Sequence, residues 1–233
     1  MSGKSAWVTI WVHPRATIRR IVTENKKQSL WLLATIYGFS ALLGTFQSFS
    51  LGSVIGMIPI FVLAVILAPI WGYIAFAIWS WLVLWTGKWF KGLGDFQSVR
   101  AAYAWSCVPI AVSDLIWIVM LVMFGSTLFS MQPNAPIFSQ AQSIVLLVLL
   151  FGKVVFSIWS LVIYLNTLAE VQQFSILRAI GNVIIAGLFV AIIVGIFSAL
   201  SLYFLGAPLE QSNSASAAFQ ILQEGRWVYS QAM

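Results

Sequence analysis

The chain has 233 residues, of which 61% are hydrophobic and 8% are charged, and it carries 12 Trp and 17 Phe. A soluble domain of this size cannot bury so much apolar surface, so the composition excludes the soluble class. The net charge of +6 would suit nucleic acid, but no basic run is interleaved with aromatic residues. We therefore expect no nucleic acid to bind. Cys107 is the single cysteine, so no disulfide can form within the chain.

Apolar runs of about twenty residues separate the charges, which is the length that a helix needs to cross roughly 30 Å of hydrocarbon. Backbone groups must be paired in lipid and the alternation of a barrel is absent, so the runs predict helices. The sequence predicts an all-α integral membrane protein, a bundle of five transmembrane helices at about 30–49, 54–85, 101–128, 143–164 and 180–204. This domain, at 30–205, follows an N-terminal arm at 1–29 and precedes a short tail at 206–233.

The arm is amphipathic and predicts an interfacial segment. Trp7 and Trp11 belong to one apolar patch, while Ile18 and Ile21 belong to a second patch beyond Pro14. Basic side chains take the polar side, where lipid phosphates would lie. The residues expected to contact headgroups, anionic ones above all, are Trp7, Trp11, Arg15, Arg19, Arg20, Lys26 and Lys27.

The second apolar stretch, 54–85, is too long for one upright helix and contains Pro59 and Pro69. It predicts a single kinked or tilted span.

Small residues recur at four-residue spacing in two of the predicted spans. The first span has Ala34 and Gly38, and the fifth has the longer stripe Gly187, Ala191, Gly195 and Ala199. Helices in lipid pack closely along such stripes. We expect helix–helix contact at both places.

Two ionisable residues fall inside predicted spans, Asp114 in the third and Lys153 in the fourth. Each would cost roughly 2.5–3.5 kcal/mol alone at a helix centre. They lie at similar depth on consecutive antiparallel helices, so we expect them to pair. The pair is either a structural bridge, with a snorkelling lysine as its variant, or a proton or ion site on a transport route.

Polar residues gather where the fourth span ends, in a connector at 166–178. Asn166, Glu170, Gln172 and Gln173, with Arg178, form either a partner surface or a solvated helix end. His13 is the only histidine, and no catalytic, phosphate-binding or metal-binding motif occurs. We expect no enzyme activity, no cofactor and no metal.

Most lysines and arginines fall on one side of the predicted spans, whereas the opposite side receives Arg226. This imbalance predicts a cytoplasmic N-terminus and, after five spans, a C-terminus outside. We expect a bacterial cytoplasmic (inner) membrane.

Three stretches resemble the Yip family, membrane proteins named for their interaction with Ypt/Rab GTPases, and match its short bacterial type. They are residues 11–18, residues 100–109, and residues 159–161 with 168–179. The resemblance implies five spans, a cytoplasmic N-terminus and a non-enzymatic role. The eukaryotic Asp-Leu-Tyr-Gly-Pro motif is missing from the sequence, so Rab binding is not implied.

Composition and resemblance together predict a membrane scaffold or adaptor in membrane organisation or trafficking-like processes. Its partners would be a bilayer with anionic lipids and either a protein partner or a second copy. The alternative is a small transporter or channel component that uses Asp114 and Lys153.

Overall fold

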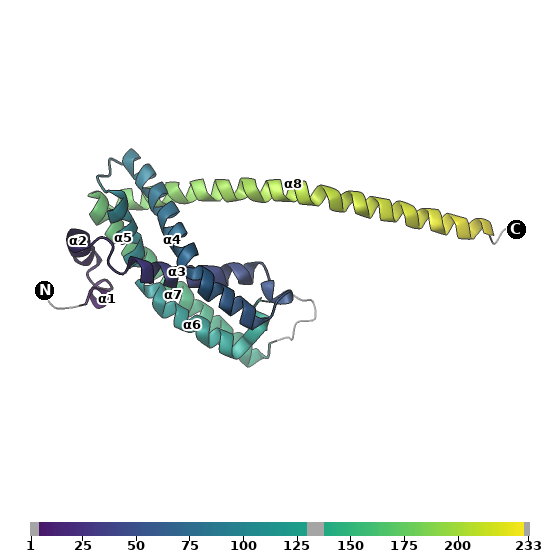
Figure 1. Ribbon diagram of the computed structural model, residues 1–233, viewed down its shortest axis with the longest axis horizontal. Coiled ribbons are helices and arrows are strands. Elements are labelled where there is room, and N and C mark those ends of the chain that lie inside the picture. Colours follow the sequence, from purple (N-terminus) through teal and green to yellow (C-terminus); the bar gives the residue numbers. More distant parts are fainter. Residues whose placement is uncertain (1–4, 130–137, 231–233) are drawn as a thin grey trace. The chain divides into compact units, whose positions relative to one another are not determined.

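The computed structural model describes residues 5–129 and 138–230, and within these ranges it contains helices and no strand (Figure 1). This confirms the predicted all-α class. The elements are α1 (Ala6–Thr9), α2 (Pro14–Glu24), α3 (Leu30–Ser48), η1 (Leu51–Ser53), α4 (Met57–Trp89), α5 (Phe96–Ser106), α6 (Val108–Phe124), η2 (Gly125–Phe129), α7 (Gln140–Gln172) and α8 (Ile176–Ser230).

Five segments of the described chain are long and apolar enough to cross a membrane, which agrees with the predicted number. They are Leu30–Ser48, Met57–Trp89, Phe96–Phe124, Gln140–Gln172 and Ile176–Ser201. The third combines α5 and α6, which are separated at Cys107, two residues before Pro109. Proline lacks the backbone N–H that a continuous helix needs, which explains the break.

α4 and α7 are longer than the predicted spans. Each contains 33 residues and is therefore about 50 Å long. The hydrocarbon core is only about 30 Å thick. The polar last turns of α7 therefore extend beyond the hydrocarbon.

The chain divides into two units, residues 1–183 and 184–233. α8 begins in the first unit and continues through the second to Ser230. The fifth apolar segment ends at Ser201, close to the predicted end of the span at 204. The helix itself continues through Gly206 and Pro208, and the tail at 206–233 stays a prediction. The segment beyond Pro208 is rich in Ala, Gln, Glu and Leu, residues that favour helix.

Within the first unit, α3 packs most extensively against α4. The contact is closest at Gly38 and Gly72. A methyl group on Gly38 would collide with the carbonyl oxygen of Ala68, and one on Gly72 with that of Ala34. The close approach predicted from Ala34 and Gly38 is confirmed.

Local sequence signals set the starts of several helices. Pro14 is at the first position of α2, where its missing N–H costs nothing. Asp95 caps α5 by accepting from the backbone N–H groups of Gln97 and Ser98. Ser139 and Gln142 form a capping box at the start of α7.

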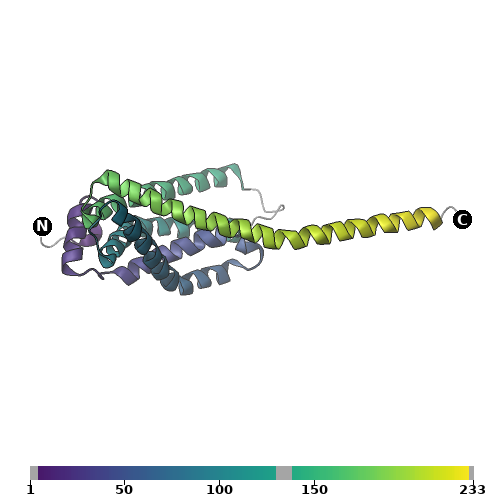
Figure 2. The same cartoon turned by 90° about the horizontal axis from the view of Figure 1, so that it is seen from above.

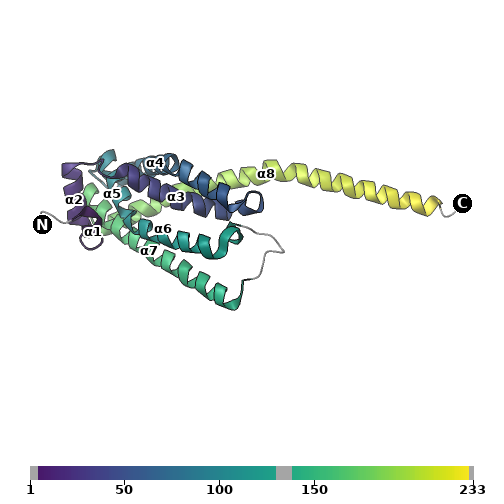
Figure 3. The ribbon, with the colours of Figure 1, turned by 60° about the horizontal axis from the view of Figure 1, so that its bottom comes forward.

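α1 and α2 lie at one end of the first unit, beside α5 and the last turns of α7 (Figures 2 and 3). The α3–α4 turn is at the other end. The hydrophobic core at the α2 end is built around the fully buried Trp105, Ile18 and Leu33.

Candidate functional site

The arm, α1 with α2, is docked on the bundle. Ile10, Ile18 and Ile21 are fully buried. The Trp7 ring meets Trp105 edge to face with centroids 5.6 Å apart, and Trp11 meets Phe156 at 6.4 Å. We expected the two tryptophans among lipid headgroups. The structure gives both of them protein contacts, and their contact with headgroups stays a prediction.

Two arginines of α2 bind two residues of the connector. Arg15 donates through Nε to the Asn166 side-chain oxygen at 3.2 Å, and Arg19 donates through Nε to Glu170 at 2.7 Å. The arginines are four residues apart on α2, as their partners are on α7, so the two contacts follow the same order along both helices. Hydrogen bonding and the charge of Glu170 raise the pKa of Arg19. Two regions that the sequence predicted separately therefore form one surface.

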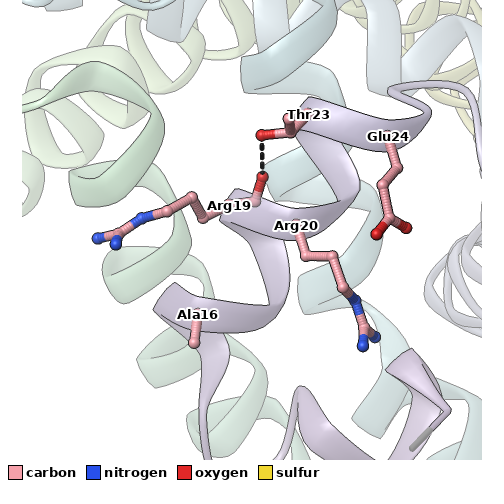
Figure 4. A pocket seen from close by; sticks show the side chains of 5 residues that line it. All are labelled: Ala16, Arg19, Arg20, Thr23 and Glu24. Atoms are coloured by element: carbon pink, nitrogen blue, oxygen red, sulfur yellow. Dashed lines mark hydrogen bonds between the residues drawn. The ribbon is translucent and has the colours of Figure 1, made fainter. Parts of the chain in front are cut away.

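Arg19 and Arg20 leave α2 on opposite sides, as Figure 4 shows. Both line a groove with Ala16, Thr23 and Glu24, in which the Thr23 hydroxyl donates to the Arg19 carbonyl oxygen at 2.8 Å. The sequence grouped Arg20 with Arg15 and Arg19. In the structure Arg15 and Arg19 contact the connector, whereas the Arg20 side chain points to the other side of α2.

Lys26 binds Asp95 at the start of α5, with Nζ 2.6 Å from Oδ2. Burial raises the pKa of Asp95, but hydrogen bonds from Lys26 and Ser98 and the charge of Lys26 outweigh it, so the pKa falls to about 2. Lys27 is exposed. Sequence reasoning missed Asp95, although an aspartate directly before an apolar periodic run signals a helix N-cap.

Gln172 is completely buried, so it was wrongly assigned to a partner surface. Its side-chain oxygen accepts from the Gly94 N–H at 3.2 Å, and its carbonyl oxygen accepts from the Leu93 N–H at 3.0 Å. It thus fixes the α4–α5 loop to the end of α7. The next residue, Gln173, is exposed with φ of 56°, and Arg178 is exposed as well.

A second buried polar contact joins the start of α8 to α4. The Thr86 hydroxyl lies 2.5 Å from the Asn182 side-chain oxygen, and the Asn182 amide donates to the Val83 carbonyl oxygen at 3.1 Å. Sequence reasoning missed both side chains, because lone polar residues in apolar runs have no distinctive pattern.

Asp114 and Lys153 do not form the direct ion pair that we expected; no nitrogen–oxygen contact within 4 Å joins these two described residues. Lys153 instead places Nζ 3.6 Å from the centroid of the Trp117 ring. Asp114 lies beside the Ser40 hydroxyl and within electrostatic range of Lys153. Lys153 is on the predicted helix, but its side chain points toward the Trp117 ring. A functional role of Asp114 and Lys153 stays a prediction.

A cavity of about 320 Å³ lies among the helices near the hydroxyls of Tyr37, Tyr103 and Tyr164. The Trp79 Nε1 donates to the Tyr164 hydroxyl at 3.0 Å. Among the described residues, no charged side chain lines this cavity. Neither Asp114 nor Lys153 lines this cavity.

The stripe Gly187, Ala191, Gly195 and Ala199 lies on α8 within the second unit. Its packing against another helix stays a prediction. Among the described residues, no group of three or more histidine, cysteine or carboxylate side chains could hold a metal ion.

The family model of the Yip1 domain matches residues 8–200. The chain belongs to this family. No curated protein and no solved structure shows significant similarity to the chain. The Yip1 domain match begins inside the docked arm and includes the connector, so the surface formed by Arg15, Arg19, Asn166 and Glu170 lies within the family domain.

Proposed function

We propose that this Yip1-domain protein is a non-enzymatic membrane scaffold or adaptor that acts in membrane organisation or trafficking-like processes. The observation that carries the proposal is the docking of α2 on the connector through Arg15–Asn166 and Arg19–Glu170. It joins two polar segments of an apolar chain into one surface. An adaptor needs such a polar face on a protein that is otherwise covered by lipid.

The connector beyond Glu170 offers the part of this surface that a partner would touch. Gln173 and Arg178 are exposed, and Leu177 between them is 80% exposed. Binding of a partner would remove the apolar surface of Leu177 from water, which is favourable. We infer that a protein partner, or a second copy of the chain, binds here.

The proposed orientation places the arm and the connector in the cytoplasm and the C-terminus outside. The arm end carries Arg15, Arg19, Lys26 and Arg178, and such basic residues favour the cytoplasmic side. The membrane we propose is a bacterial cytoplasmic (inner) membrane, whose anionic lipids would meet the basic arm.

Site-specific photo-crosslinking in cells tests the adaptor role. A crosslinker at Leu177 should capture one reproducible protein, and the yield should fall when Arg178 is replaced by Ala. A crosslinker at Val148, an exposed apolar position in the first third of α7, is the matched control. Capture of lipid alone at both positions would contradict the proposal.

One observation favours a transporter as the second candidate. The Asp114 Oδ1 atom is buried without a hydrogen-bond partner among the described residues, although the carboxylate also lies beside the Ser40 hydroxyl. Ionisable residues inside a membrane often mark ion routes. Proteoliposomes should then show proton or small-solute flux that Asp114→Asn abolishes. Equal leakage through both proteins would reject this role.

A further inference from the structure

Arg15 and Arg19, the arginine pair, are held by one nitrogen each. Both use Nε for their contact with α7, and in the described part of the chain neither has a second side-chain partner. The Arg19 side chain is 71% exposed, whereas that of Glu170 is 19% exposed. Figure 4 shows the Arg19 guanidinium extended away from α2. Arg15 is exposed as well, so the terminal nitrogens of both arginines are accessible to solvent.

The geometry orients the two guanidiniums together. Residues four apart on a helix lie about 5–6 Å from each other, and their acceptors on α7 have the same spacing. A guanidinium fixed at Nε presents its two terminal nitrogens as a fork that fits phosphate oxygens. Asn166 is neutral, so Arg15 keeps its full charge toward an incoming anion.

Exposed apolar residues on the same arm point to a lipid as the source of the phosphate. Val8 is 66% exposed and Val12 is 72% exposed, and these two are also four residues apart. A soluble phosphate compound gains nothing from them. A phospholipid can place its acyl chains against the valines and its phosphate at the arginines.

We propose that the arginine pair binds the phosphate of an anionic phospholipid headgroup, with Asn166 and Glu170 as positioning residues that aim the guanidiniums outward. This inference deepens the proposed function, because it names the lipid chemistry that the arm recognises. It differs from a general basic surface in requiring orientation as well as charge.

Variants that separate orientation from charge test the proposal. The full chain in detergent is mixed with equal amounts of phosphatidylglycerol and phosphatidylcholine, and the lipids retained are counted by native mass spectrometry. Asn166→Ala removes an acceptor without changing any charge. Replacing both Arg15 and Arg19 with Lys keeps both charges but removes the forks. We expect each change to lower the preference for phosphatidylglycerol by about fivefold.

Glu170 provides the sharpest comparison. Glu170→Gln and Glu170→Ala both remove one negative charge, but only Gln still accepts from the Arg19 Nε. The positioning role predicts that Gln keeps the preference and Ala loses it. If charge alone governs binding, both variants should bind phosphatidylglycerol more tightly, and that result would overturn the proposal.

Lys88→Gln is the matched control, because it removes an exposed positive charge in the last turn of α4, outside the arm. It should leave the preference nearly unchanged. An equal loss in Lys88→Gln, or full retention in the double Lys variant, would refute the arginine pair as a site. Competition by glycerol phosphate as strong as that by the lipid would refute the choice of a lipid.

Folding is controlled by the elution profile of each variant, and the double Lys variant alone decides the matter if Asn166→Ala elutes as aggregate. A variant that loses the lipid preference but keeps the crosslinking at Leu177 supports both proposals. If the protein with native arginines prefers phosphatidylglycerol but captures no protein at Leu177, only the adaptor role is rejected.

Discussion

Arg19 on α2 binds Glu170 on α7 across 151 residues of sequence, with Nε 2.7 Å from Oε1. The pair is largely open to solvent on the arginine side, and exposed ion pairs contribute little to stability. The arm is therefore held mainly by its apolar face, and the arginines provide its orientation.

Ile18 should dominate the docking of the arm. It is completely buried, and Ile18→Ala is expected to destabilise the docked state by about 2–5 kcal/mol. Limited proteolysis in detergent should then cleave the arm faster. Val12→Ala, at an exposed position, and Arg19→Gln should have much smaller effects. Equal protection of wild type and Ile18→Ala would show that the arm is not docked.

The contact of Lys26 with Asp95 should weaken in acid. The pKa of Asp95 is lowered from 3.8 to about 2, so its contribution to stability is complete above about pH 4 and is lost as the pH falls through about 2. Hydrogen exchange at the amides of Gln97 and Ser98, which Asp95 caps, should quicken over that window beyond its intrinsic pH dependence. Asp95→Asn should remove the added dependence. An identical profile in both proteins would contradict the assignment.

Substitution of Gly38 or Gly72 should separate α3 from α4. The groups that a methyl would meet are backbone carbonyls, which cannot rotate away, so we expect a loss of about 1–3 kcal/mol from overpacking. Thermal unfolding in detergent measures it. Gly44→Ala is the control, because no described atom lies within 4 Å of the added carbon. Wild-type stability of Gly38→Ala would disprove the close crossing.

Two neighbouring glutamines should respond in opposite ways. Gln172→Leu removes the side-chain acceptor of the half-buried Gly94 N–H, which costs about 1–3 kcal/mol. Gln173→Ala changes an exposed side chain and should be nearly neutral. The unfolding temperature of the two variants distinguishes them, and equal temperatures would argue against the buried placement of Gln172.

Asp114→Asn should be tolerated in stability. Removing one partner of a direct buried ion pair costs about 3–5 kcal/mol, but Lys153 lies over Trp117 rather than on the carboxylate. We expect less than half that loss in the unfolding of the purified protein. Trp117→Leu should cost more than Asp114→Asn. A severe loss of stability in Asp114→Asn would indicate that Asp114 and Lys153 form a direct ion pair after all.

The sequence predicted features that depend on length and local spacing. Long apolar runs indicate spans because the thickness of the bilayer sets a minimum helix length, and Gly38 indicates close packing because of its size. The burial of Gln172 and the turn of Lys153 toward Trp117 depend on rotation about the helix axis, which uniformly apolar spans leave unspecified. The contact of Arg19 with Glu170 joins segments with no shared local pattern.

The arm's partners on α7 also impose an order on assembly. Arg15 and Arg19 are synthesised about 150 residues before Asn166 and Glu170, so the arm cannot dock until the fourth span has been inserted. During that interval Ile18 and Ile21 lack their protein contacts and the nearest apolar surface is the membrane itself. The arm can therefore dock only after the first four spans have come together. A protease that cleaves the free arm would act on incomplete chains first.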